Sequence, residues 1–127
     1  MVRRSRRVLG GNIKKICCRG AMFPKSLITF FNNLNIKLTN GYGMTECSSI
    51  ISIGSNINSN TVGKINPHCK IKIVNGTILV SGSILMSGYF KEPELTNEKI
   101  KDGWLNTEDM GFIDNKGDCI LPEGKRT

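Results

Sequence analysis

Apolar residues recur with two different periods in the first part of the chain. Between residues 24 and 35 they fall at i, i+3, i+4 and i+7, which predicts an amphipathic helix with Pro24 near its start. These apolar residues are Leu27, Phe30, Phe31 and Leu34. Residues 13–18 predict a short buried strand, and the alternation in residues 36–39 predicts a second strand. Strand, helix and strand in this order indicate an α/β layer, which binds ligands beyond the carboxyl ends of its strands.

From residue 54 onward, short strand-like runs alternate with turn residues. Strands are expected around Val62 and at residues 71–74 and 78–80. Asn75-Gly76 separates the last two runs and predicts a tight hairpin, because both central residues of such a turn need positive φ. These features predict a small antiparallel β unit that follows the α/β layer.

A short helix and a second hairpin are expected further along. Glu92-Pro93 opens the helix, which runs to about Ile100, and Asp102-Gly103 turns the chain. Residues 112–121 predict the hairpin, with its turn at residues 115–117. The predicted fold class is therefore α/β plus a small antiparallel β unit.

The domain organisation follows from this change of pattern. We expect residues 1–53 to form the edge of an α/β subdomain and residues 54–121 to form a β-rich subdomain. Residues 3–9 are basic and predict a helix that Gly10-Gly11 ends.

The composition is that of a globular chain. The 127 residues are 39% hydrophobic and 22% charged, values that exclude disordered and fibrous classes. No apolar run approaches the roughly 20 residues that span a bilayer, and no apolar stretch follows the basic N-terminus as a signal peptide requires. We therefore expect a cytoplasmic protein.

The net charge of +8 is concentrated near the N-terminus. Eight of the 18 Lys/Arg residues precede Ser26, a stretch without acidic residues, and the remainder is balanced. Such a segment could bind phosphate backbones or form a solvated helix face. We favour the second, because no aromatic residue lies among the arginines as a stacking surface for nucleic acid would need.

The five cysteines have no C-x-x-C spacing and are odd in number, which argues against a zinc site and a disulfide framework. The one histidine, His68, follows Pro67 and is interpreted as a surface turn residue.

Residues 40–46 bring together three kinds of group that a nucleotide site needs. Tyr42, next to Gly43, offers an aromatic face on which a base can stack, or it packs at a turn. Thr45 offers a hydroxyl to a phosphate oxygen, and Glu46 offers a hard carboxylate of the kind that Mg²⁺ shares with phosphates. Further on, Asp109 could accept two hydrogen bonds from a ribose, or cap a turn.

Five stretches in order resemble the adenylate-forming (AMP-binding) superfamily. Residues 10–21 are similar to its strand ending in a Gly-Gly-Ala floor, and residues 40–46 to its Y-G-x-T-E motif. Residues 62–64 resemble T-V-G-K-P, residues 80–90 resemble R-G-x-x-x-M-x-G-Y-Y, and residues 102–111 resemble D-G-W-x-x-T-G-D-x-G. The residues in these motifs resemble most those of the long-chain fatty acid–CoA ligases. Peptide-synthetase adenylation domains share the same motifs, so the resemblance leaves the identity of the acid substrate open.

The resemblance implies an acid–thiol ligase that uses ATP, Mg²⁺ and coenzyme A to activate a carboxylic acid as its adenylate. It implies that Thr45 and Glu46 are catalytic, with Glu46 as the metal ligand. The implied nucleotide-binding residues are Gly20, Ala21, Tyr42, Gly43, Thr45 and Asp109.

The chain resembles an internal fragment of the large N-terminal domain of such an enzyme. Residues 122–127 resemble the start of the inter-domain hinge, with Gly124 or Lys125 at the hinge position. We expect the fragment alone to be inactive, because it lacks the phosphate loop and the lysine-bearing C-terminal domain, and any peripheral membrane association to involve the missing parts. The alternative is a non-catalytic fragment or a small basic module that binds nucleic acid.

Three positions depart from the family pattern. Glu108 stands where the family has glycine in Thr-Gly-Asp, and Arg19 stands where it prefers a small residue. Pro67 lies two residues beyond the family's proline position.

Overall fold

The computed structural model describes residues 2–19, 24–54, 57 and 61–121. Its helices and strands are, in chain order, α1 (Val2–Val8), β1 (Lys15–Cys18), α2 (Lys25–Asn33), β2 (Lys37–Tyr42), the 3-10 helix η1 (Thr45–Cys47), β3 (Ser52–Ile53), β4 (Thr61–Ile65), β5 (Cys69–Val74), β6 (Thr77–Gly82), α3 (Pro93–Lys99), β7 (Ile100–Lys101), β8 (Trp104–Met110), β9 (Phe112–Ile113) and β10 (Asp118–Ile120).

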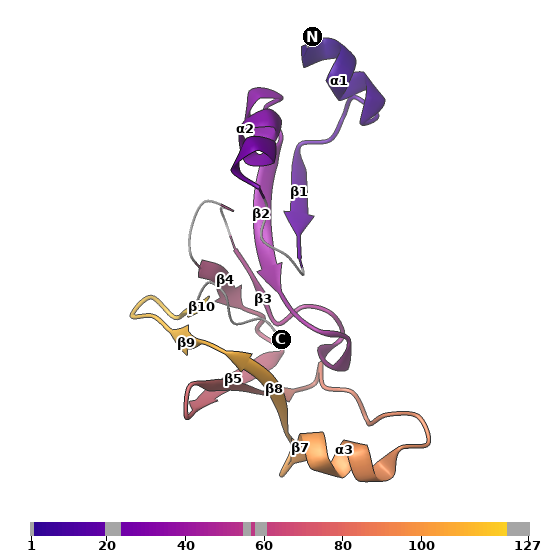
Figure 1. Ribbon diagram of the computed structural model, residues 1–127, viewed down its shortest axis with the longest axis vertical. Helices are drawn as coiled ribbons and strands as arrows, with labels where there is room; N and C mark the ends of the chain where they lie inside the picture. The colour runs from indigo at the N-terminus through magenta and orange to yellow at the C-terminus, as the bar shows by residue number, and fades with distance from the viewer. Residues whose placement is uncertain (1, 20–23, 55–56, 58–60, 122–127) are drawn as a thin grey trace.

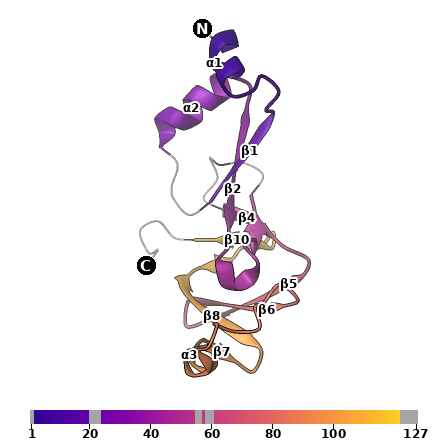
Figure 2. The same cartoon turned by 90° about the vertical axis from the view of Figure 1, so that its right-hand side faces the viewer.

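The strands form two sheets. The larger has six strands in the order β1-β2-β3-β4-β10-β9, and the smaller has four in the order β5-β6-β8-β7. The molecule is elongated: α1 and α2 lie with β1 and β2 at one end, and α3 lies with the four-stranded sheet at the other (Figure 1). The view turned by 90° shows the same separation (Figure 2). The predicted combination of an α/β layer with a small antiparallel β unit is confirmed.

The strand–helix–strand unit at the N-terminal end is also confirmed, because β1 and β2 pair in parallel with α2 between them in sequence. The prediction that residues 13–18 form a buried strand is wrong in two respects. Strand β1 begins only at Lys15, and none of its residues is fully buried. The physical reason is its place at the edge of the sheet, where it has β2 as its neighbour on one side.

Helix α2 forms where it was predicted, but the side chains that it buries are not all those of the predicted apolar stripe. Leu34 is buried, whereas Leu27 and Phe30 are each 43% exposed. The helix instead buries Ile28, which lies outside the predicted stripe. A face that is apolar in sequence is buried only as far as a neighbour covers it, and none of the described residues covers Leu27 or Phe30 fully.

Both predicted hairpins are present. Asn75 and Gly76 have φ of 50° and 79°, as a two-residue turn between β5 and β6 requires. The second hairpin joins β9 and β10, and α3 begins at Pro93 as predicted.

The main core lies between the two sheets. It is built from buried residues of both sheets, of η1 and of the bend before β3: Tyr42, Cys47, Ile51, Val62, Cys69, Ile78, Val80, Leu105 and Cys119. None of the helices in the described residues has the length and apolar character needed to cross a bilayer.

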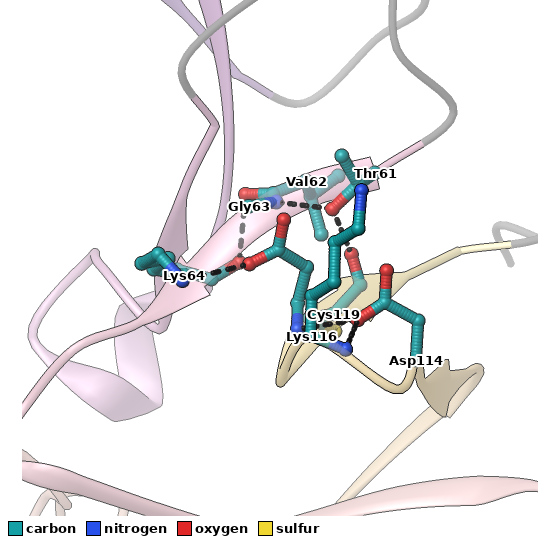
Figure 3. Close-up of polar contacts among 9 residues, drawn as sticks. Thr61, Val62, Gly63, Lys64, Asp114, Lys116 and Cys119 are labelled. Atoms are coloured by element: carbon teal, nitrogen blue, oxygen red, sulfur yellow. Dashed lines mark hydrogen bonds and ion pairs between the residues drawn. The ribbon is translucent and has the colours of Figure 1, made fainter.

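A polar cluster fixes β4 against β10, as Figure 3 shows. The Thr61 hydroxyl donates to the carbonyl of Cys119 and accepts from the Gly63 amide, both at 2.9 Å. Lys64 pairs with Asp118 at 3.5 Å.

Strands on both sides of residue 53 share one sheet, so the subdomain boundary at that residue stays a prediction. The predicted hinge at residues 122–127 lies outside the described residues.

Candidate nucleotide site

Two residues from the separate candidate motifs meet in the structure. The hydroxyl of Tyr42 donates a hydrogen bond to Oδ2 of Asp109 at 2.7 Å. Tyr42 is the last residue of β2, and Asp109 lies near the end of β8, so the bond joins the six-stranded sheet to the four-stranded one. The motifs around residues 40–46 and 102–111 therefore meet at this bond, and their joint nucleotide site stays a prediction.

Strand β2 extends beyond residues 36–39, where the sequence predicted a strand. Gly41 and Tyr42 belong to β2 and pair with β3, so the strand ends later than residue 39. Gly43 is needed for close packing, since a Cβ there would lie 2.0 Å from the carbonyl oxygen of Ser49. The glycine thus lets the chain fold back tightly after β2.

The ring of Tyr42 is packed into the core between the sheets and is 7% exposed. Burial raises the pKa of its phenol above the ordinary value, and the bond to Asp109 adds to this effect. The phenol therefore stays protonated and serves as a donor. Stacking of the ring on a purine stays a prediction.

Asp109 is held by the residue two places before it. The hydroxyl of Thr107 donates to the carbonyl of Ile78 at 2.8 Å and accepts from the Asp109 amide at 3.2 Å. The register between β6 and β8 shifts at this point, which leaves room for an irregular β8 backbone. The irregularity aims the carboxylate of Asp109 at the end of β2.

Glu108 occupies the middle of this irregular segment with φ of 62°. That left-handed conformation suits glycine and explains why the related motif carries glycine at this position. The carboxylate of Glu108 pairs with the ammonium of Lys99 at the end of α3. Its negative charge is thus directed to a lysine.

The turn after β2 carries the other two candidates. Thr45 and Glu46 lie in η1, where Thr45 is exposed and Glu46 is half-buried. The turn closes through the bond from the Ile51 amide to the Tyr42 carbonyl at 2.9 Å. The guanidinium of Arg19 donates to the carbonyl of Ser49. This residue, which departs from the family pattern, therefore contacts the end of the turn that follows η1.

Glu46 has a partner that the sequence reasoning did not name as a site residue. The hydroxyl of Tyr89 donates to Oε1 of Glu46 at 2.8 Å, and this bond raises the pKa of the Tyr89 phenol. In the sequence, the signal for this contact is the Gly88-Tyr89-Phe90 stretch within the family resemblance of residues 80–90.

The donor chemistry fits a nucleotide with a divalent cation. Glu46 supplies a hard carboxylate, and Thr45 supplies an exposed hydroxyl on the same turn. No group of three or more His, Cys, Asp or Glu side chains that could hold a metal occurs in the part of the chain that is described. A cation at Glu46 would therefore need oxygen ligands from phosphates. Gly20 and Ala21, predicted beside the adenine, lie outside the described residues.

The family model described as AMP-binding enzyme matches residues 2–90, which include β1, β2, η1 and the Tyr89 segment. The chain belongs to the AMP-binding enzyme family. The match covers Tyr42, Thr45 and Glu46, while Asp109 lies beyond it.

Curated relatives of this AMP-binding chain carry ligase names. The long-chain-fatty-acid–CoA ligase FadD15 of Mycobacterium bovis is 33% identical over 127 residues, covering 98% of this chain and 21% of that protein. The long-chain-fatty-acid–CoA ligase of Haemophilus influenzae is 33% identical over 129 residues, covering 83% of this chain and 23% of that protein. The chain thus spans about a fifth of the length of the curated relatives it matches.

Solved structures of one synthetase share the fold. The unliganded O-succinylbenzoate coenzyme A synthetase (MenE) of Bacillus subtilis has a TM-score of 0.75 and 28% identity, covering 88% of this chain and 27% of that one. The same synthetase in complex with ATP and magnesium ion has a TM-score of 0.72 and 26% identity, covering 91% of this chain and 29% of that one. The chain therefore has the fold of part of an adenylate-forming enzyme.

Proposed function

We propose that this chain is part of an ATP-dependent acid–thiol ligase that activates a carboxylic acid, in particular a fatty acid, as its adenylate and transfers it to coenzyme A. The observation that carries the proposal is the 2.7 Å hydrogen bond between Tyr42 and Asp109. It joins the two stretches that resemble nucleotide-binding motifs, although 67 residues separate them. The family membership and the ligase names of the relatives support this function over a basic nucleic-acid-binding module.

Within the proposed site, each residue contacts a different part of the nucleotide or its cation. Asp109 accepts hydrogen bonds from the ribose, and Tyr42 fixes the carboxylate while its ring borders the base. Thr45 donates to the α-phosphate, and Glu46 ligates Mg²⁺. When bound, the cation neutralises negative charge on the phosphate oxygens. The complex of the B. subtilis synthetase with ATP and magnesium supports both as ligands.

The protein's contribution to the proposed reaction is positioning and electrostatic stabilisation. The substrate carboxylate attacks the α-phosphorus of ATP and releases pyrophosphate, and the thiol of coenzyme A then displaces AMP. We further propose that the enzyme works in the cytoplasm, where ATP and coenzyme A are available.

The test is a chimera in which residues 2–121 replace the matching stretch of the M. bovis ligase. The assay measures ATP–pyrophosphate exchange that depends on fatty acid. The concentrations of ATP and of two fatty acids of different length are varied in turn. Asp109→Ala should lower kcat/KM for ATP by about 2–4 kcal/mol, because the ribose loses hydrogen bonds to a charged acceptor. Tyr42→Ala should cost about 1–3 kcal/mol if the ring stacks on the base.

The matched control is Glu94→Ala, which removes an exposed carboxylate from α3. It should leave both kinetic parameters unchanged. A shift in the preferred fatty acid for Asp109→Ala, with ATP use unaffected, would assign this residue to the acid pocket and contradict the proposal.

A further inference from the structure

The carboxylate of Glu46 is held from one side by the segment that connects β6 to α3. In Figure 1 this orange segment runs beside the magenta turn that follows β2. Its three bonds to the turn lie within a few residues of one another. The Met86 amide donates to the Glu46 carbonyl at 2.8 Å, Ser48 Oγ donates to the Ile84 carbonyl at 2.9 Å, and Tyr89 donates to Glu46 Oε1 at 2.8 Å.

Tyr89 is itself fixed in place by α3. Its amide donates to Oγ1 of Thr96 at 2.9 Å, and the same hydroxyl donates to the Glu92 carbonyl at 2.8 Å. Gly88 permits this approach, because a Cβ there would lie 2.9 Å from Thr96 Cγ2. The backbone of Tyr89 is therefore hydrogen-bonded to helix α3, which restrains the position of the ring.

We propose that Tyr89 is a positioning residue for Glu46: its hydroxyl occupies Oε1 and so holds the carboxylate in one orientation, in which Oε2 is the oxygen offered to a divalent cation. This inference rests on the proposed function, in which Glu46 ligates the cation. A carboxylate that is held before the cation arrives loses less side-chain freedom on binding, and such outer partners commonly set metal affinity.

The charges near Glu46 fit this role. Lys99 lies close enough to Glu46 to interact with it electrostatically, but its ammonium is paired with Glu108. The bond that Glu46 receives among the described side chains comes from the neutral phenol of Tyr89. A neutral donor orients the carboxylate and leaves its charge available for a cation.

The first experiment measures binding to the full 127-residue chain. The probe is Mn²⁺·ATP, followed by electron paramagnetic resonance of free Mn²⁺, and ATP without metal is titrated in parallel. Tyr89→Phe keeps the ring and removes only the hydroxyl, so it should weaken Mn²⁺ binding by about 10- to 100-fold and leave metal-free ATP binding unchanged. Glu46→Gln should weaken Mn²⁺ binding at least as much, and adding Tyr89→Phe to it should have no further effect.

Two controls separate positioning from general damage. Phe90→Leu alters the neighbouring ring, which is 86% exposed, and should not change Mn²⁺ affinity. Thr96→Ser keeps the hydroxyl that holds the Tyr89 amide and should behave like the wild type, whereas Thr96→Val should weaken Mn²⁺ binding in the same direction as Tyr89→Phe. Equal losses of Mn²⁺ and metal-free ATP affinity in Tyr89→Phe, or no loss of either, would overturn the proposal.

A second measurement needs no ligand. With selectively ¹³C-labelled glutamate, NMR relaxation of the Glu46 γ-methylene reports how tightly the side chain is held. Tyr89→Phe should increase its motion, and an unchanged relaxation rate would overturn the inference. If the wild-type chain binds no Mn²⁺·ATP, the chain alone does not form the nucleotide site, and the same titration in the chimera with the M. bovis ligase tests the proposed function. The relaxation result still decides whether Tyr89 holds Glu46.

Discussion

Tyr42 and Asp109 lie at the ends of strands from two different sheets, and one hydrogen bond of 2.7 Å joins them. The phenol that donates this bond is buried, while the carboxylate that accepts it is half-buried. The bond therefore couples the packing of the two sheets to the geometry of the proposed nucleotide site. Its strength can be measured without any ligand.

Tyr42→Phe and Asp109→Asn should each lower the free energy of unfolding, by about 1–3 kcal/mol, because each alters a partly buried hydrogen bond to a charged acceptor. The double variant should be less destabilised than the sum of the two, with a coupling energy of about 1–2 kcal/mol. Urea denaturation of the four proteins gives this coupling directly. Strictly additive losses would show that the two groups do not interact in solution.

Thr39→Val should stabilise the protein. The hydroxyl of Thr39 is fully buried and finds no hydrogen-bond partner among the described residues. Valine has nearly the same shape, so the change removes an unsatisfied polar group at a gain of about 1 kcal/mol. The midpoint of thermal unfolding should rise, and a fall would mean that the hydroxyl has a partner after all.

Thr107→Val should have the opposite sign, although the change is chemically identical. The buried hydroxyl of Thr107 bridges the Ile78 carbonyl and the Asp109 amide. Its loss leaves both backbone groups without this partner and should cost about 1–3 kcal/mol. Thr29→Val removes a similar hydroxyl-to-carbonyl bond on the exposed surface of α2 and serves as the matched control, with little expected change.

Glu108→Gly should be more stable than Glu108→Ala by about 1 kcal/mol, because only glycine relieves the left-handed backbone of this position. Both variants lose the pair with Lys99, so their difference isolates the backbone term. Lys99→Met measures the pair alone and should cost less than about 1 kcal/mol, since Glu108 is exposed. Equal stability of the glycine and alanine variants would contradict the assigned strain.

Stability should fall as the pH rises above about 9, which is the ordinary pKa of a thiol. Burial raises the pKa values of the Cys47 and Cys119 thiols to about 12. The unfolded chain then loses protons that the folded chain retains, so stability present below pH 9 is lost progressively toward pH 12. Urea titrations at pH 8 and 10.5 should show this fall, and a smaller one in the Cys47→Ala/Cys119→Ala variant. A pH-independent wild type would contradict the shifts.

The sequence predicted well those features that depend on short-range backbone chemistry. Asn75-Gly76 predicted its hairpin because positive φ is a local requirement, and Pro93 predicted the start of α3 for the same kind of reason. The sequence predicted the amphipathic helix but not the exposure of Leu27 and Phe30, because burial depends on which surfaces meet these side chains. Periodicity reports an apolar face and carries no information about its neighbour.

The candidate site was foreseen only in part, for a related reason. The residue types in the stretches around Tyr42 and Asp109 suggested a nucleotide site, but nothing in the spacing showed that the two side chains touch. The role of Tyr89 depends on how the β6–α3 connection packs beside η1, and the role of Lys99 depends on how α3 packs against β8. Such contacts join residues that are distant in sequence, and one sequence without an alignment does not encode them in any visible pattern.

The strand order of the six-stranded sheet has a consequence for biosynthesis. Strand β10, which a ribosome makes last among the described strands, lies between β4 and β9. Until residue 120 has emerged, β4 therefore exposes one side of its backbone, and an unpaired strand edge favours association between nascent chains. A chain arrested before Asp118 should be prone to aggregation even though its four-stranded sheet is already complete.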